Sequence, residues 1–199
     1  MKKRFIFLTL ALSIGGTNVA KAASVMNTGI GAQAGAYWGL GTMHDATGSI
    51  NSRVMDTASF DGLVGYRFAG LLIGALGEYQ LVGQLTDPVK VSNTNMRGNG
   101  WLAGAGLGYS LLFLDLSGGV FFLGKHSNTN ADVYGNFVSF GNPLGLEFTA
   151  GFRILPGFSV DAKVSITRYG KLTGGTTDYD ISENRLMVRD AALGVSFHY

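Results

Sequence analysis

Three histidines are the residues of this sequence best suited to exchange protons near neutral pH. His44 precedes Asp45, His126 precedes Ser127, and His198 is the last residue but one. A hydrolytic His–Ser pair needs both side chains on one face of an element, whereas adjacent residues of an extended chain point to opposite faces. No glutamate lies at a suitable spacing from His126 either. We therefore expect no catalytic residue.

Other site chemistries are excluded by residue type or by context. The sequence has no cysteine, which excludes a disulfide scaffold, a thiol nucleophile, a cysteine zinc site and a lipid-modified N-terminal cysteine. It contains no P-loop, GxSxG, HExxH or EF-hand pattern. The Gly-x-Gly run from Gly104 to Gly108 falls within an expected strand, so it does not predict a phosphate-binding loop. No cofactor and no metal ion are expected.

Charged and amide residues alternate with apolar ones along much of the chain. The set comprises Asp61, Arg67, Glu78, Asp115, Glu147, Arg153, Asp161, Lys163 and Asp190, with Gln33 and Gln80. Inside a closed sheet these charges must pair, because isolated burial costs several kcal/mol. We expect a salt-bridged plug in which Glu147 or Asp161 pairs with Arg153. A gated pore and a catalytic carboxylate pair are the alternatives.

The elements that must position these residues are β-strands, because apolar residues recur at every second position. Eight segments show this alternation: residues 29–39, 59–69, 71–82, 100–110, 112–123, 144–154, 158–169 and 189–199. Their lengths match the roughly 9–11 residues that a tilted strand needs to cross a membrane. The pattern predicts an all-β fold, an eight-stranded antiparallel up-and-down transmembrane barrel.

The connections between these segments alternate in length. Tight turns are expected around Ala69-Gly70, Ser110-Leu111 and Leu155-Pro156-Gly157. The linkers between them are longer, polar and rich in glycine, and cover about residues 40–58, 83–99, 124–143 and 170–188. Short turns at one end and long loops at the other are typical of outer-membrane barrels.

The first 22 residues have the three regions of a secretory signal peptide. Residues 1–4 include three basic side chains, residues 5–14 form an apolar run, and Ala20-Lys21-Ala22 is a small-x-small cleavage site. Four of the 15 basic residues lie in this segment, which leaves 11 against 13 acidic residues and a net charge near −2. We therefore expect a barrel domain over residues 23–199 that does not bind nucleic acid.

Two other architectures compete with the membrane barrel. Residues 98–114 form an uncharged run of 17 that contains five glycines, but a transmembrane helix usually needs about 20 residues and each glycine costs about 1 kcal/mol. A soluble barrel of the lipocalin type would turn its polar face to water. In the fourth segment that face is Gly104, Gly106, Gly108 and Ser110, which suits a cramped interior better than a solvated surface.

The chain resembles the small eight-stranded outer-membrane barrels of the OmpA/OmpX type. The resemblance covers residues 23–199 and lies in the amphipathic strands, the alternating connections, the signal peptide and the terminal aromatic residue. It implies periplasmic termini, extracellular long loops, and an assembly signal formed by Phe197 and Tyr199. We expect no peptidoglycan-binding domain after the barrel, because the sequence ends with the eighth segment. The implied partners are outer-membrane lipid and lipopolysaccharide, the outer-membrane assembly machinery, and host or cell-surface ligands.

Aromatic residues near the strand ends suit the two interfacial girdles of such a barrel. They are Trp38, Tyr66, Phe68, Tyr79, Trp101, Tyr109 and Tyr169. The function expected from all these features is that of a non-enzymatic integral outer-membrane protein, with an envelope-structural or adhesin-like role through its loops. A narrow pore for ions or small solutes and a lipid A-modifying enzyme are the alternatives.

Overall fold

The computed structural model describes residues 28–44, 53–86, 93–94, 98–128, 138–174, 177–181 and 186–199. The expected signal peptide and the start of the barrel domain at residue 23 lie outside these residues. So do parts of the four long connections. No helix in these ranges is long and apolar enough to cross a membrane.

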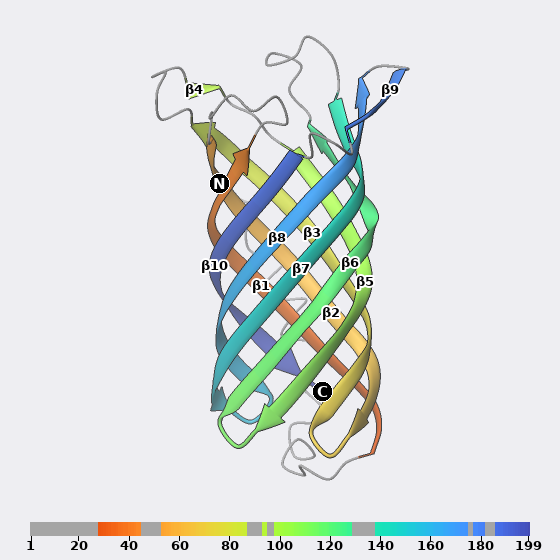
Figure 1. The fold of residues 1–199 in the computed structure, drawn as a ribbon. Helices are drawn as coiled ribbons and strands as arrows, with labels where there is room; N and C mark the ends of the chain where they lie inside the picture. The colour runs from red at the N-terminus through yellow and green to blue at the C-terminus, as the bar shows by residue number, and fades with distance from the viewer. Residues whose placement is uncertain are drawn as a thin grey trace, which may run out of the picture.

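Eight long strands form one closed antiparallel sheet (Figure 1). They are β1 (Gly29–His44), β2 (Arg53–Phe68), β3 (Leu71–Thr86), β5 (Gly98–Leu111), β6 (Leu114–Asn128), β7 (Val138–Leu155), β8 (Phe158–Gly174) and β10 (Leu186–His198). Two short strands, β4 (Asn93–Thr94) and β9 (Thr177–Asp180), pair with β3 and β8 in the long connections. Strand β10 pairs with both β8 and β1, which closes the barrel. The predicted fold class is confirmed.

The strands extend further toward the long loops than the sequence pattern predicts. Strand β2 begins at Arg53 instead of residue 59, and β7 begins at Val138 instead of residue 144. Apolar alternation marks only the part of a strand whose outer face is apolar, whereas backbone hydrogen bonding needs no such pattern. The pattern therefore ends before the strand does.

Three tight turns connect the strands at the other end. The turn between β2 and β3 is Ala69–Gly70, with φ of 49° and 83°, which are the left-handed values of a type I′ hairpin. The turn expected at Ser110–Leu111 lies instead at Leu112–Phe113, and Leu112 has a φ of 48°. The run Leu111–Leu114 is apolar throughout, so alternation does not mark where the strand stops.

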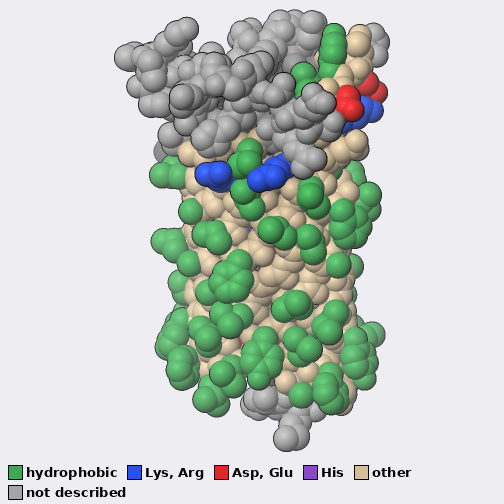
Figure 2. All heavy atoms as spheres, viewed as in Figure 1, with side chains coloured by type: hydrophobic (Ala, Val, Ile, Leu, Met, Phe, Trp, Pro, Cys, Tyr) green, Lys and Arg blue, Asp and Glu red, His purple; other side chains and the backbone are tan. Residues whose placement is uncertain are grey.

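The two faces of the sheet differ in the size and chemistry of their side chains. Large apolar side chains cover the outer face in a broad belt (Figure 2). Small residues occupy interior positions where neighbouring strands come close. Gly65 and Gly74 are register partners on β2 and β3, and a Cβ on Gly65 would overlap the carbonyl oxygen of Ile73. Glycine at these positions allows the two backbones to approach.

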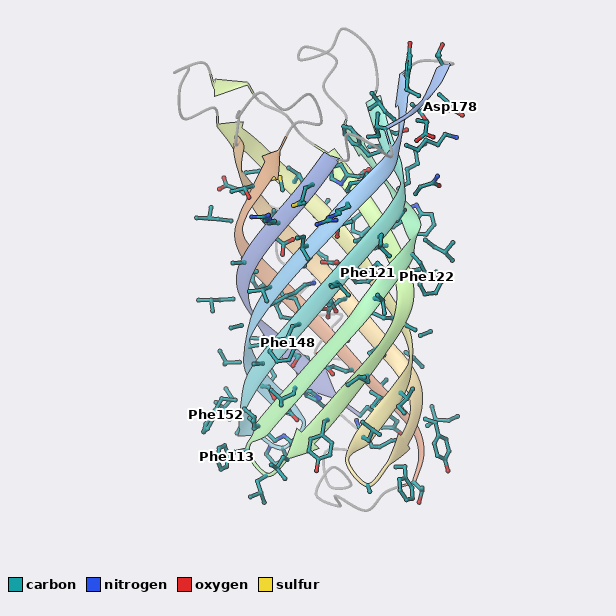
Figure 3. The ribbon with its side chains drawn as sticks, in the orientation of Figure 1. Phe113, Phe121, Phe122, Phe148, Phe152 and Asp178 are labelled. Carbon is teal, nitrogen blue, oxygen red and sulfur yellow. The ribbon has the colours of Figure 1, made fainter. Side chains whose placement is uncertain are left out.

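A β-bulge on β6 changes which side chains point inward. The register with β5 shifts between Ala103 and Gly104, where Leu123 and Phe121 are the partners. Phe121 is 0% exposed, whereas Phe122 is 54% exposed (Figure 3). Leu123 is 56% exposed like its neighbour Phe122, so the alternation expected over residues 112–123 is interrupted at its end. Beyond the bulge the even-numbered residue His126 points inward and is buried.

Candidate functional site

The centre of the barrel interior is the side chain of Lys163 on β8, which is 1% exposed. Its Nζ lies 2.6 Å from Glu78 Oε1, 3.1 Å from Glu147 Oε2 and 3.3 Å from Asp61 Oδ2. These carboxylates come from β3, β7 and β2, so one ammonium connects strands on different sides of the lumen. The arrangement cross-links the barrel from within.

Lys163 forms hydrogen bonds with two of the three carboxylates but not with the third. Nζ of Lys163 donates to Glu78, to Asp61 and to Ser59 Oγ at 3.3 Å. Glu147 Oε2 makes its ion pair at an angle that does not form a hydrogen bond. Three carboxyl groups thus share one cation in a water-poor space, where breaking a pair is costly because the remaining charges stay buried.

Tyr37 on β1 connects the cluster to a fourth carboxylate. Its ring centroid lies 4.9 Å from Lys163 Nζ, within the range of a cation–π interaction. Its hydroxyl donates to Asp161 Oδ2 at 3.2 Å. Tyr37 is absent from the expected interior set because its neighbours are glycine and alanine. Its parity with Gln33 is the signal that identifies it, and both are buried.

A second cluster lies in the interior at the tight-turn end. Arg153 on β7 pairs with both carboxylate oxygens of Asp115 on β6, and its Nη1 donates to Leu112 O at 3.2 Å. The expected partners of Arg153, Glu147 and Asp161, are not its partners. In the sheet register Asp115 lies opposite Gly151, so Arg153, two residues further along β7, is its diagonal neighbour.

His198, two serines and Asp115 meet in this second cluster. The His198 Nε2 lies 3.0 Å from Ser196 Oγ, 3.4 Å from Ser159 Oγ and 3.5 Å from Asp115 Oδ2. Ser159 also donates directly to Asp115. A catalytic triad uses one ring nitrogen for the hydroxyl and the other for the carboxylate. Here all three partners share Nε2, and both serines are fully buried, so the geometry does not activate a nucleophile.

The remaining expected interior residues occupy separate positions. Ser165 Oγ donates to Asp190 Oδ1 at 2.8 Å. Gln33 Nε2 donates to Ser117 Oγ at 3.4 Å, whereas the Nε of Arg67 is buried without a hydrogen-bond partner. Gln80 is buried.

Apolar side chains fill much of the interior around these clusters. The buried apolar core comprises Met55, Leu63, Leu72, Leu76, Val82, Leu102, Phe121, Phe140, Tyr169 and Val188. An interior cavity of about 10 Å³ lies beside Asp61, Glu147 and Gln33, which is room for about one water molecule. Packed apolar side chains and the two ionic clusters therefore occupy the described part of the interior.

Two residues near the loop end differ from their expected positions. Tyr169, expected in an aromatic girdle, is 1% exposed inside the barrel. The physical reason is parity, because odd-numbered residues of β8 such as Lys163 point inward. His126, expected in a loop, lies within β6 with its ring centroid 6.4 Å from that of Tyr169. The main chain of His44 belongs to β1.

The other six aromatic residues expected in the girdles are exposed on the outer face: Trp38, Tyr66, Phe68, Tyr79, Trp101 and Tyr109. At the tight-turn end Phe113 and Phe152 also lie on the outside (Figure 3), with ring centroids 5.5 Å apart. In the described ranges, no group of three or more His, Asp or Glu side chains is arranged to hold a metal ion.

Comparison with known proteins gives matches of fold. No family model and no curated protein sequence matches the chain. Neisserial surface protein A matches over 86% of this chain and 98% of its own, with a TM-score of 0.52 and 16% identity. Ail, the attachment invasion locus protein of Yersinia pestis, matches over 87% of this chain and 100% of its own, with a TM-score of 0.51 and 14% identity.

Identities this low establish the fold alone. The chain is a closed eight-stranded antiparallel barrel of the small outer-membrane type, with an apolar belt outside and packed ionic clusters inside.

Proposed function

We propose that this chain is a non-enzymatic integral protein of a bacterial outer membrane, with an envelope-structural or surface-interaction role carried out by its long loops. The observation that carries the proposal is the filled interior around Lys163. A barrel whose lumen is occupied by packed side chains offers its ligands only the two ends and the lipid-facing wall.

The filled interior also argues against the pore alternative. Conduction through this lumen requires Lys163 to release Glu78, Glu147 and Asp61, each of which would then remain buried near like charge. The cost of such a step is several kcal/mol. The shared Nε2 contacts of His198 argue in the same way against a hydrolytic site.

The loop end supplies a surface suited to protein or glycan contact. Strands β7 and β8 continue past the apolar belt, and β9 adds a further exposed strand to β8 (Figure 1). Asp178 on β9 pairs with Lys171 at 2.6 Å and accepts from Thr173 at 2.7 Å. These hydrogen bonds, first that from Lys171, lower the pKa of Asp178 and so keep this exposed hairpin charged.

The comparisons are compatible with such a role. The solved Ail structure is a complex with the heparin analogue sucrose octasulfate, so that protein accommodates an anionic saccharide. For the present chain we propose that residues 1–22 direct export, that Phe197 and Tyr199 are read by the assembly machinery, and that the loops face outward. Ligands of the loops would then be host or cell-surface molecules.

Labelling of intact cells tests this proposal directly. A short protease site or epitope inserted within residues 129–137, between β6 and β7, should be accessible from outside, whereas one inserted at Pro156–Gly157 should not. Planar-bilayer recordings of the purified protein should show no stable conductance. An accessible Pro156–Gly157 site would reverse the orientation, and stable channels would support the pore. Lipid A of unchanged mass in cells with and without the protein would exclude the lipid-modifying alternative.

A further inference from the structure

Two arginines lie on the lipid-facing wall of the barrel, apart from both interior clusters. Arg168 on β8 and Arg189 on β10 are exposed. The register pairs Arg168 with Met187 and Arg189 with Ile166, so the two arginines are diagonal neighbours on adjacent strands. Diagonal neighbours are about 7–8 Å apart, within reach of each other's long side chains.

The two guanidinium groups lack acidic partners in the described part of the chain. Arg168 has no ion pair or hydrogen bond there, and Arg189 Nε donates only to Met187 Sδ at 3.3 Å. This contact turns Arg189 toward the residue opposite Arg168. Figure 2 shows basic side chains at the loop-end edge of the apolar belt, whereas the acidic side chains visible in that view gather near β9. The wall therefore carries concentrated positive charge at this point.

An apolar groove of about 1010 Å³ ends at the same place. It extends from Ile73 on β3 across the outer face of β5 to β8 and reaches Arg189 on β10. Its apolar lining includes Leu107, Leu146, Phe148, Val164 and Ile166. Residues such as Ala105 and Gly118 on its floor are small. Apolar walls that lead to a cation are complementary to an amphiphile with an acyl chain and an anionic headgroup.

We propose that Arg168, Arg189 and this groove form a binding site for a phosphorylated glycolipid of the lipopolysaccharide type. Its phosphate monoester lies between the two guanidinium groups, and an acyl chain lies in the groove. The inference rests on the proposed function, namely an outer-membrane location with the loop end facing outward. The two arginines would then lie in the outer leaflet, which is the leaflet that holds such lipids.

Two neighbouring guanidinium groups favour a phosphate monoester as the headgroup of the bound lipid. Guanidinium groups bind phosphate in a bidentate manner, and a pair of them can share one dianionic monoester. A phosphodiester carries a single charge and matches such a pair less well. Met187, Ile166 and Leu144 surround the arginines on the neighbouring strands, which limits water around the contact and strengthens it.

Native mass spectrometry of the purified full chain in a non-ionic detergent tests the site. The probes are bisphosphorylated lipid A, the same lipid A with both phosphates removed, and phosphatidylglycerol. The parent protein should bind bisphosphorylated lipid A most tightly. Arg168→Gln and Arg189→Gln should each weaken that binding about fivefold, and the double variant about 25-fold, since one cation near an anionic lipid surface contributes about that factor.

Lys125→Gln is the matched control. Lys125 is an exposed cation on β6 opposite Trp101, outside the groove, and its loss should change lipid A binding less than twofold. A gel shift between heated and unheated samples shows that each variant is folded. An Arg168→Lys, Arg189→Lys double variant should retain more binding than the glutamine pair, because charge is kept.

Three results would overturn the site: equal binding of bisphosphorylated lipid A by the parent and the double glutamine variant, equal binding of the dephosphorylated lipid, or equal binding of phosphatidylglycerol. Failure of the proposed function is a separate outcome. A wrong orientation or location would be detected by the cell-surface labelling. The native mass spectra use purified protein, so the lipid binding that they measure does not depend on orientation in the cell.

Discussion

Lys163 Nζ lies 2.6 Å from Glu78 Oε1, and this contact joins β8 to β3 across the barrel interior. The two strands are not neighbours in the sheet, so the pair connects walls that backbone hydrogen bonds do not connect directly. Glu147 and Asp61 approach the same ammonium. One residue thereby fixes the relative positions of four strands.

Removing this ammonium should destabilise the barrel strongly. Lys163→Met leaves three carboxyl groups buried together, and we expect the free energy of unfolding to fall by about 3–5 kcal/mol. Urea titration of the protein in lipid vesicles measures this. Lys125→Met, at an exposed position, is the control and should change stability by less than about 0.5 kcal/mol. Adding Glu78→Gln to Lys163→Met should restore part of the loss; equal stability of Lys163→Met and the control would contradict the bracing role.

The pairing at the tight-turn end can be measured by double-mutant cycles. Arg153→Ala and Asp115→Ala should show a coupling of about 1–3 kcal/mol, since contacting residues in one network are not additive. The cycle of Arg153→Ala with Glu147→Gln should show a coupling near zero, because Glu147 belongs to the Lys163 cluster. A larger coupling for Glu147 than for Asp115 would show that Arg153 has another partner.

The fold is predictable from this sequence because large apolar residues recur at every second position along the long strands. Leu144, Leu146 and Phe148 illustrate this pattern. The partner of Arg153 was not predictable in the same way. Alternation gives the face of a residue, whereas partners depend on register. Asp115 and Arg153 lie on β6 and β7, which are joined by the long connection over residues 129–137, so no tight-turn sequence marks the register between them.

The misassigned interior residues have two different causes. Tyr169 shares the inward parity of Lys163, so its position was available from the sequence but was hidden by the frequency of tyrosine in aromatic girdles. His126 points inward because the β6 bulge shifts the inward parity from odd to even residues, whereas Phe121 lies before the bulge and keeps the inward parity of Asp115. A bulge inserts one residue without a clear mark in composition, so only the structure identifies it.

Close strand approach predicts a strong effect from the smallest substitution. A methyl group at Gly65 or Gly74 would overlap a backbone carbonyl oxygen of the neighbouring strand. Overpacking of this kind costs about 1–3 kcal/mol of stability. Gly65→Ala and Gly74→Ala should each lower the urea midpoint of unfolding. Gly62→Ala is the matched control on the same strand, since its nearest atom would be 3.8 Å away. Equal midpoints for all three variants would show that the strands can separate at no cost.

The C-terminal residues can be tested for a role in assembly distinct from barrel closure. Backbone bonds of 2.8 and 2.9 Å join Tyr199 to Ala32, and the side chains of Phe197 and Tyr199 are exposed. A double variant with Phe197→Ala and Tyr199→Ala keeps these backbone hydrogen bonds, so the purified protein should refold in detergent. Its level in the outer membrane of cells should fall well below that of Phe152→Ala, another exposed aromatic at this end. Equal levels would remove the assembly role.

The assignment of faces can be tested residue by residue, because the chain contains no native cysteine. Single cysteines at Leu146, Phe148 and Leu193, which are exposed on the outer face, should react with a membrane-soluble maleimide and resist a charged one. Cysteines at the buried positions Thr149 and Ser196 should react slowly with bulky reagents of either kind. Labelling in vesicles followed by mass shift reports both rates.

Arginine substitutions provide the energetic counterpart of the labelling. Phe148 faces outward near the middle of β7, and an arginine near the bilayer midplane of a barrel costs about 2–4 kcal/mol. Phe148→Arg should therefore reduce insertion into vesicles, with Phe148→Leu as the control of similar polarity to the parent. Free reaction of the charged maleimide at residue 148, together with normal insertion of Phe148→Arg, would mean that the belt meets water. In that case the chain would be a soluble barrel, because only a water-exposed wall tolerates a charge where lipid is expected.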